Sequence, residues 1–229
     1  ECAVNKVFGS EVLSRTVDEC VQLHGGYGFI AEYPIERAYR DSRINRIWEG
    51  TNEVNRMLIP GTLMRRVMRG KLMSVMQFQQ QISQALATGD LGIPDYEGAA
   101  APALRIAAQL RRLSIFVSGL AAAKFDRKIV REQVALVACA DLMIQAYTVD
   151  SAARRAAQSG SELQCLLANL HAATTVDQAR SLANRTLKDI DARDAMAMIS
   201  PLLDDGDLNL TDLAYNVSIP LLEAGAFTV

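Results

Sequence analysis

Apolar side chains recur every three or four residues along almost the whole chain, and this spacing constrains the fold more than any other feature. Residues at this spacing share one face of an α-helix. No segment shows the strict apolar and polar alternation of a half-buried strand. The sequence therefore predicts an all-α protein. Near the start, the apolar stripe is made by Val4, Val7, Phe8, Val12, Leu13, Val17, Cys20 and Val21.

Helix-breaking residues divide the predicted helices into an early and a late group. Gly25 and Gly26 should end the first helix, and Pro60 followed by glycine should kink or interrupt a later one. Residues 87–96, rich in glycine, Asp and Pro, form the best linker candidate. The late helices should form an antiparallel bundle with short connections. The expected helices span residues 36–44, 52–66, 77–86, 103–124, 131–155, 162–172, 175–190, 192–203 and 210–222.

The composition is typical of a soluble intracellular protein: 22% of the residues are charged and the net charge is −2. This balance lacks the basic excess of a nucleic-acid-binding surface. No uninterrupted apolar stretch approaches the roughly 18–20 residues of a membrane-spanning helix, so no transmembrane segment is predicted. The cysteines lack C-x-x-C spacing and should be reduced thiols. Neither His24 nor His171 has a partner at metal-ligand spacing, so no metal site is expected.

The stretch Ile-Trp-Glu-Gly-Thr-Asn-Glu, which begins at Ile47, places a carboxylate, a glycine and a hydroxyl at the start of a helix. Thr51 can cap that helix. Glu49 could remove a proton from a carbon beside a thioester, a step that needs a base within hydrogen-bonding reach and exclusion of water. Ile47 and Trp48 could desolvate this carboxyl and raise its pKa, and Gly50 leaves room for a substrate. The alternative is a solvated turn before an ordinary helix cap.

This stretch and two upstream segments, Gln-Leu-His-Gly-Gly-Tyr-Gly-Phe from Gln22 and Tyr-Pro-Ile-Glu-Arg from Tyr33, resemble the C-terminal signature of the acyl-CoA dehydrogenases. The resemblance runs from about residue 2 to residue 66. It implies a flavoenzyme of fatty acid β-oxidation that converts acyl-CoA to trans-2-enoyl-CoA, with Glu49 taking the α-proton and FAD receiving the β-hydride. It also implies that Gly50 contacts the substrate and that Gln22, Leu23, His24, Gly25, Gly26, Thr51, Asn52 and Glu53 contact FAD.

The same resemblance implies an electron-transfer flavoprotein as electron acceptor and a homodimer or homotetramer. In such an assembly, Gln22 to Gly26 would contact the FAD of a neighbouring subunit. We expect a cytoplasmic location in a bacterium or the mitochondrial matrix in a eukaryote. The first residues lack an initiator methionine and a capping signal, so we expect the chain to begin inside a helix. Family members hold FAD and the acyl chain largely through earlier domains, so this fragment alone should be inactive.

Residues 67–229 are similar in size and helical character to the domain appended to the very-long-chain type of the family. We therefore divide the chain into a partial catalytic C-terminal domain, residues 1–66, and an appended helical bundle, residues 67–229, and we expect a long acyl substrate. The segment from Met64 to Met73 has four positive charges and three methionines. It is either a peripheral membrane contact or a helix end whose cations complement the dipole. An acyl-CoA oxidase and a non-catalytic helical oligomerisation or interaction module remain alternatives.

Overall fold

The structure is a computed structural model that describes residues 1–206 and 208–225. The described residues form α-helices and short 3-10 helices, with no strand among them, so the all-α prediction is confirmed. The chain divides into two compact units, Glu1–Arg65 and Arg66–Val229. This division lies one residue before the boundary predicted from the sequence. The assignment of the two units to a catalytic and an appended domain stays a prediction.

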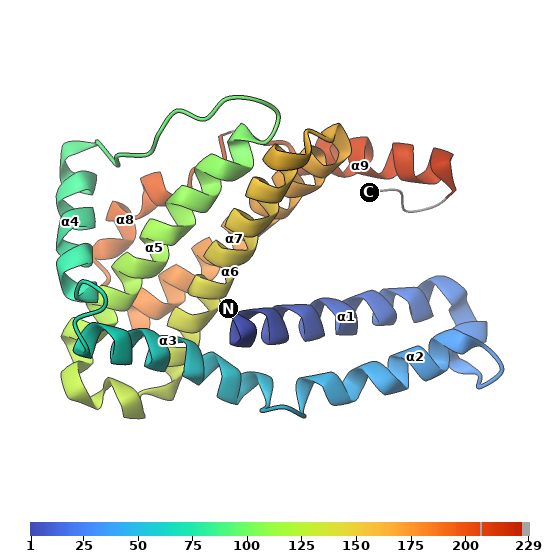
Figure 1. Cartoon of the computed structure of the whole chain (residues 1–229), viewed down its shortest axis with the longest axis horizontal. Helices are drawn as coiled ribbons and strands as arrows, with labels where there is room; N and C mark the ends of the chain where they lie inside the picture. The colour runs from blue at the N-terminus through green and yellow to red at the C-terminus, as the bar shows by residue number, and fades with distance from the viewer. Residues whose placement is uncertain (207, 226–229) are drawn as a thin grey trace. The chain divides into compact units, whose positions relative to one another are not determined.

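The first unit is built on a long helix, α1 (Cys2–His24), beside which α2 (Pro34–Ser42) runs in the opposite direction (Figure 1). Helix α1 ends at the predicted place because Gly25 adopts a φ of 58°, a left-handed value that costs glycine little. Pro60 lies inside α3 (Asn52–Met68), so the predicted interruption of that helix is wrong. The remaining elements are η1 (Gly25–Phe29), η2 (Arg43–Arg46) and α3, whose last residues, 66–68, lie past the boundary between the units.

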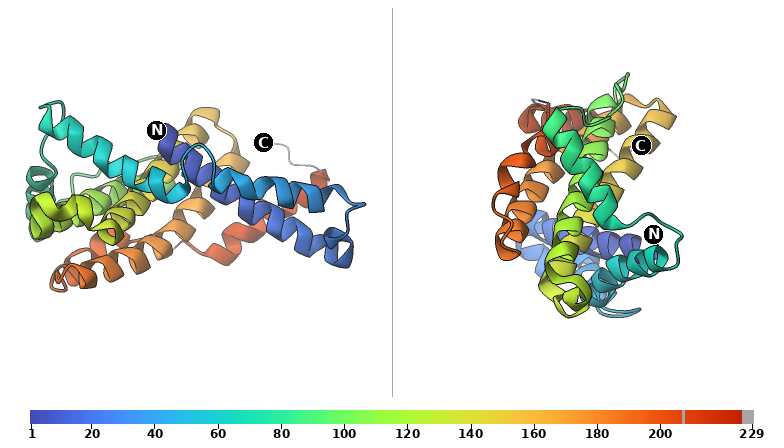
Figure 2. Two further views of the ribbon diagram at one scale, coloured as in Figure 1. Left: turned by 90° about the horizontal axis from the view of Figure 1, so that it is seen from below. Right: turned by 90° about the vertical axis from the view of Figure 1, so that its left-hand side faces the viewer.

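The second unit is a helical bundle around α5 (Ala101–Phe125), which packs against α4 (Val75–Thr88), α6 (Gln133–Ser159) and α7 (Glu162–Asp189). Figures 1 and 2 show α5, α6 and α7 lying side by side. Short connections join α5 to α6 and α6 to α7, so the predicted antiparallel bundle is confirmed, whereas residues 89–100 form a longer connection between α4 and α5. The elements are α4 (Val75–Thr88), α5 (Ala101–Phe125), η3 (Asp126–Arg131), α6 (Gln133–Ser159), α7 (Glu162–Asp189), α8 (Ala195–Met198), η4 (Ser200–Leu203) and α9 (Leu210–Ala224).

Helix α5 lies at the centre of this bundle because it carries large apolar side chains that fill the core and small side chains that allow close helix contacts. Its fully buried large side chains are Ile106, Leu110, Leu113, Phe116 and Val117. Burying each of them contributes about 1.5–3 kcal/mol relative to exposure. The small residues among them let neighbouring helices come close. They include Ala103, Ala107, Gly119 and Ala121.

Three sequence predictions about the second unit need correction. The predicted break after residue 172 is wrong, because α7 is continuous: the hydroxyls of Thr174 and Thr175 donate to carbonyls one turn earlier, at 2.8 and 2.7 Å, and Ala173 is buried. The predicted helix over residues 192–203 is reduced to the short α8 and η4, and Asp191, which precedes it, takes a left-handed φ of 57°. Residues 87–96 join α4 to α5 within one unit rather than separating two units.

The possible membrane contacts remain predictions. By length and composition α5 and α6 could each cross a bilayer. However, 67% of the most apolar 18-residue stretch of α5 and 50% of that of α6 are buried inside the protein, as in ordinary core helices. The segment from Met64 to Met73 includes the end of α3 and the turn that precedes α4. The cationic side chains of Arg65, Arg66, Arg69 and Lys71 are exposed there, whereas the side chain of Met68 lies outside what the structure describes.

The cysteines behave as the sequence predicts. All four are free thiols; Cys139 and Cys165 are buried in the second unit, Cys2 is exposed and Cys20 is half-buried. Burial raises the pKa of the Cys139 thiol. Cys139 is therefore an inert core residue at neutral pH.

Gly119 provides a test of the packing between α4 and α5. A Cβ at this position would lie 2.7 Å from Cγ of Gln79 and 3.2 Å from the carbonyl oxygen of Val75. We expect Gly119→Ala to lower the free energy of unfolding by about 1–3 kcal/mol, because α4 must move away. The control Gly9→Ala in α1 meets nothing within 4 Å and should leave stability unchanged or raise it by up to about 1 kcal/mol. Urea unfolding followed by circular dichroism measures both, and equal stability of the two variants would contradict this account.

Candidate functional site

Glu49 and Gly50 form a left-handed turn directly before α3, with φ values of 54° and 79°. The turn leads into a capped helix. Thr51 Oγ1 accepts a hydrogen bond from the amide of Val54 at 3.3 Å, which confirms the predicted cap. The Glu53 carboxylate accepts from its own backbone amide and from the Thr51 hydroxyl, and these bonds lower the pKa of Glu53. The start of α3 is thus a fixed support for the carboxylate that precedes it.

The buried side chain of Asn55 holds this turn from within α3. Its Nδ2 donates to the carbonyl oxygens of Gly50 at 2.7 Å, Thr51 at 3.1 Å and Glu49 at 3.4 Å. A Cβ at Gly50 would lie 3.1 Å from the same nitrogen. Glycine is therefore favoured at position 50 both by its positive φ and by the closeness of Asn55. The sequence interpretation assigned Gly50 to substrate contact and did not identify this internal reason.

Asn52 connects the start of α3 to the middle of α1. Its side chain is 1% exposed. Its Oδ1 accepts from Lys6 Nζ at 2.7 Å, and its Nδ2 donates to Ser10 Oγ at 3.0 Å and to Glu11 Oε1 at 3.2 Å. Lys6 also donates to the carbonyl of Gly50 at 2.8 Å. The Asn52 side chain is thus occupied by α1, so an FAD contact at this position would fall to its backbone or require these bonds to break.

Glu11 and Arg56 form a partly buried ion pair beside these bonds. Two guanidinium nitrogens of Arg56 lie 2.8 and 3.0 Å from the two carboxylate oxygens of Glu11, an arrangement with geometric specificity. Burial alone would raise the pKa of Glu11, but the hydrogen bonds and charge of Arg56, together with Asn52, hold it below its usual value. The pair adds a second link between α1 and α3.

Glu49 itself is exposed, and so are its apolar neighbours. Ile47 is 49% exposed and Trp48 is 55% exposed. The Trp48 indole N–H donates to Asn45 Oδ1 at 3.2 Å. The side chains of Ile47 and Trp48 therefore do not provide the desolvation expected from the sequence. The carboxylate at position 49 is accessible both to a ligand and to water.

The second predicted group, Gln22 to Gly26, lies at the far end of α1 and is also exposed. His24 Nδ1 lies 2.7 Å from the carbonyl oxygen of Cys20. Leu23 is 85% exposed. The helical rise places His24 about 20 Å from Ser10, which binds Asn52. Within one chain, Gln22 to Gly26 therefore lie far from the start of α3. This separation is what we expect if the two groups contribute to sites in neighbouring subunits.

The residues fit an FAD contact in part. A Cβ at Gly25 or Gly26 would meet nothing within 4 Å, so a flat ligand has access to this backbone. Thr51 offers a half-buried hydroxyl at a helix N-terminus, a position that favours anionic groups. The side chain of Asn52 does not fit such a role. Among the residues that the structure describes, no three His, Cys, Asp or Glu side chains gather as a metal site would require.

Two family models, each described as "Acyl-CoA dehydrogenase, C-terminal domain", match residues 1–64 and 109–203. The chain belongs to the acyl-CoA dehydrogenase family. It is 45% identical over 157 residues to a protein of Bacillus subtilis (strain 168) named "Probable acyl-CoA dehydrogenase", an overlap of 68% of this chain and 26% of that protein. The matched residues extend beyond the first unit, so family similarity includes part of the bundle.

A crystal structure supports the same placement. The acyl-CoA dehydrogenase complexed with FAD from Bacillus anthracis has a TM-score of 0.90 and 35% identity, and the match covers 100% of this chain and 40% of that one. The human mitochondrial very long-chain specific acyl-CoA dehydrogenase is 49% identical over only 59 residues, 26% of this chain and 9% of that protein. The chain thus spans well under half the length of these relatives.

The interaction between Asn55 and the turn can be tested directly. We expect Asn55→Ala to speed amide hydrogen exchange in residues 48–51 by about tenfold, because three carbonyls lose a buried donor. Hydrogen-exchange mass spectrometry of a peptide that contains Trp48 gives this rate. The control Asn5→Ala removes an exposed amide of α1 and should leave the exchange unchanged. Equal rates in Asn55→Ala and the unsubstituted protein would show that the turn does not depend on Asn55.

The Glu11–Arg56 pair predicts a pH dependence. Because the folded state lowers the pKa of Glu11, the stabilisation is fully present above the ordinary pKa of the carboxyl, 4.5, and is lost as the pH falls through the lowered pKa of the folded protein. Glu11→Gln should lower the unfolding free energy at pH 7 by about 1–2 kcal/mol and flatten its acid dependence. Urea unfolding followed by the fluorescence of Trp48, the sole tryptophan, reports on this unit. Glu32→Gln, at an exposed carboxylate, is the control and should change neither quantity.

Proposed function

We propose that this chain is the C-terminal part of an FAD-dependent enzyme that oxidises fatty acyl-CoA to trans-2-enoyl-CoA. The observation that carries the proposal is Glu49: an accessible carboxylate on a turn that Asn55 and the cap of α3 hold in place, in a chain of the acyl-CoA dehydrogenase family. The relatives are much longer than this chain. The activity is therefore proposed for an enzyme of the relatives' length, and the present residues alone should be inactive.

In the proposed reaction, the Glu49 carboxylate takes the proton from the α-carbon of the thioester. FAD, when bound, supplies the acceptor for the hydride that leaves the β-carbon, so that the carbon–carbon double bond forms as both depart. Gly50 has no side chain, so it leaves room for the substrate beside Glu49. A side chain at position 50 would in addition lie against Asn55. Ile47 and Trp48 leave Glu49 exposed, so the bound acyl chain and the rest of the enzyme must exclude water.

The finer features of the function are also proposals. An electron-transfer flavoprotein would accept the electrons, and Gln22, Leu23, His24, Gly25 and Gly26 would contact the FAD of a second subunit in a homodimer or homotetramer. The exposure of this group, about 20 Å along α1 from the Asn52 bonds, supports the shared arrangement. A long acyl substrate rests on the size of the second unit, since the human very long-chain enzyme matches only 59 residues. A cytoplasmic or mitochondrial matrix location stays a proposal as well.

The first experiment uses the enzyme produced from its natural start, purified with its flavin and titrated without oxygen. Acyl-CoAs of several chain lengths should bleach the flavin absorbance, and the most effective length identifies the substrate class. Glu49→Gln should abolish bleaching, a loss of at least about a thousandfold in rate, while flavin remains bound. Glu32→Gln, an exposed substitution in the same unit, should bleach as the unsubstituted enzyme does.

The outcomes separate the proposed function from the alternatives. Absence of bound flavin, or no bleaching with any acyl-CoA, would overturn the dehydrogenase and leave a helical interaction module as the better account. Rapid peroxide formation when air is admitted would identify an acyl-CoA oxidase. Bleaching that persists in Glu49→Gln would retain the reaction and exclude Glu49 as the base.

A further inference from the structure

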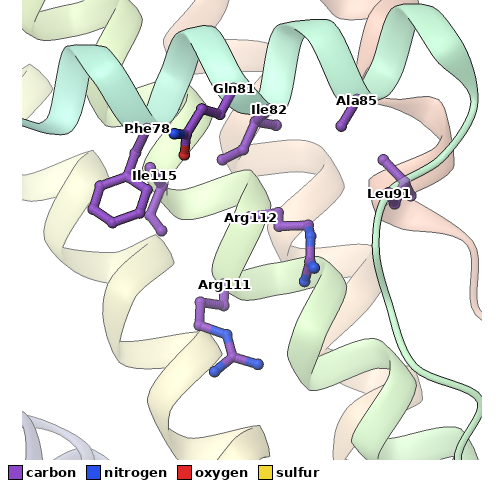
Figure 3. A pocket seen from close by; sticks show the side chains of 8 residues that line it. All are labelled: Phe78, Gln81, Ile82, Ala85, Leu91, Arg111, Arg112 and Ile115. Atoms are coloured by element: carbon purple, nitrogen blue, oxygen red, sulfur yellow. The ribbon is translucent and has the colours of Figure 1, made fainter. Parts of the chain in front are cut away.

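The second unit contains a pocket of about 480 Å³ between α4, the segment that follows it, and α5 (Figure 3). This volume lies within the range of about 300–1,000 Å³ that is usual for small-molecule sites. Every lining residue belongs to the second unit, so the pocket is separate from the turn at Glu49. The residues are Phe78, Gln81, Ile82, Ala85, Leu91, Arg111, Arg112 and Ile115.

One part of the pocket is apolar. Phe78, Ile82 and Ala85 project from α4 at helical spacing, and Leu91 and Ile115 come from the following segment and from α5 (Figure 3). Ile82 is 8% exposed, whereas Phe78 is 37% exposed and extends this wall to the surface. These side chains would bury a hydrocarbon chain but would provide no hydrogen bonds for a polar ligand.

The remaining part is cationic. Arg112 donates to the carbonyl oxygen of Gly92 at 2.8 Å and to that of Ala108 at 3.1 Å, which fixes its guanidinium at the pocket. Arg111 is exposed beside it. No Asp or Glu lines the pocket, and neither arginine has a carboxylate partner within 4 Å among the described residues. Burial, and then the neighbouring charge of Arg111, lower the pKa of Arg112, and Tyr96 opposes them only in part.

We propose that this pocket binds an anionic amphiphile, with the acyl or alkyl chain against Phe78, Ile82 and Leu91 and a carboxylate or phosphate head group on Arg111 and Arg112. Guanidinium groups suit both head groups because their donors match planar pairs of oxygens. The two unpaired cations favour an anion, and the adjoining apolar wall favours a ligand with a hydrocarbon chain over a small ion. The site lies outside the proposed catalytic region and does not depend on the proposed reaction.

The test is isothermal titration calorimetry of the whole chain with dodecanoate, dodecyl phosphate, dodecanol, acetate and inorganic phosphate, each below any micelle concentration. Dodecanoate or dodecyl phosphate should bind at one site, and the tighter of the two identifies the head group. Arg111→Gln should weaken this binding by about tenfold, because it removes a charged donor whose side chain makes no hydrogen bond or ion pair with the other residues that the structure describes. Arg185→Gln removes an exposed arginine from α7, away from the pocket, and should leave binding within about twofold.

A second variant tests the apolar part while keeping both charges. Ala85→Phe should fill the pocket and abolish binding while the unfolding midpoint stays near that of the unsubstituted protein. Equal weakening by Arg111→Gln and Arg185→Gln, or dodecanol binding as tightly as dodecanoate, would overturn the role of the arginines. Acetate or inorganic phosphate binding as tightly as the amphiphiles would overturn the role of the apolar wall. Unchanged binding in Ala85→Phe would exclude this pocket as the site.

Discussion

The buried carboxamide of Asn52 is the contact on which the geometry of the proposed catalytic turn depends. A side chain as buried as this must have its hydrogen bonds satisfied, and its partners all come from α1. Lys6 then extends the same set of bonds to the carbonyl of Gly50. The position of Glu49 is therefore determined as much by polar residues of the first helix as by its own neighbours in sequence.

A comparable dependence governs the second unit. Helix α4 meets α5 closely where Gly119 lies against Val75 and Gln79. Toward the C-terminal end of α4, at Ala85, and along the segment after it, the pocket lies between α4 and α5. Gly119 lets α5 come close to the first turn of α4, whereas Arg111 and Arg112 of α5 line the space beside the last turn of α4. The pocket and the close helix contact are thus two results of one packing arrangement.

The sequence predicted what local chemistry determines. Regular apolar spacing predicted the helices, Gly25 predicted the end of α1, and Thr51 predicted the cap of α3. The prediction of helix ends from the sequence was wrong where tertiary contacts override local signals. Examples are Pro60 inside α3 and Thr174 and Thr175 inside α7. Ser10 was not identified because its partner Asn52 lies 42 residues away along the chain and is brought near only by folding. Asn55 was not identified because its bonds to the carbonyls of Gly50 and Thr51, although local, depend on the left-handed turn at Glu49 and Gly50. A polar residue such as Ser10 within an apolar stripe was the one available signal.

The positive φ of Glu49 has a consequence for how this protein can change. A glutamate in the left-handed region is strained by about 1–3 kcal/mol, which asparagine tolerates better and glycine avoids. Random selection for heat resistance would therefore favour replacing Glu49 by one of these residues. Such a replacement would remove the carboxylate while strengthening the fold. At position 49, the residue that gives the most stable fold therefore differs from the residue that the proposed chemistry requires. Laboratory evolution for thermal stability would have to be accompanied by selection for activity.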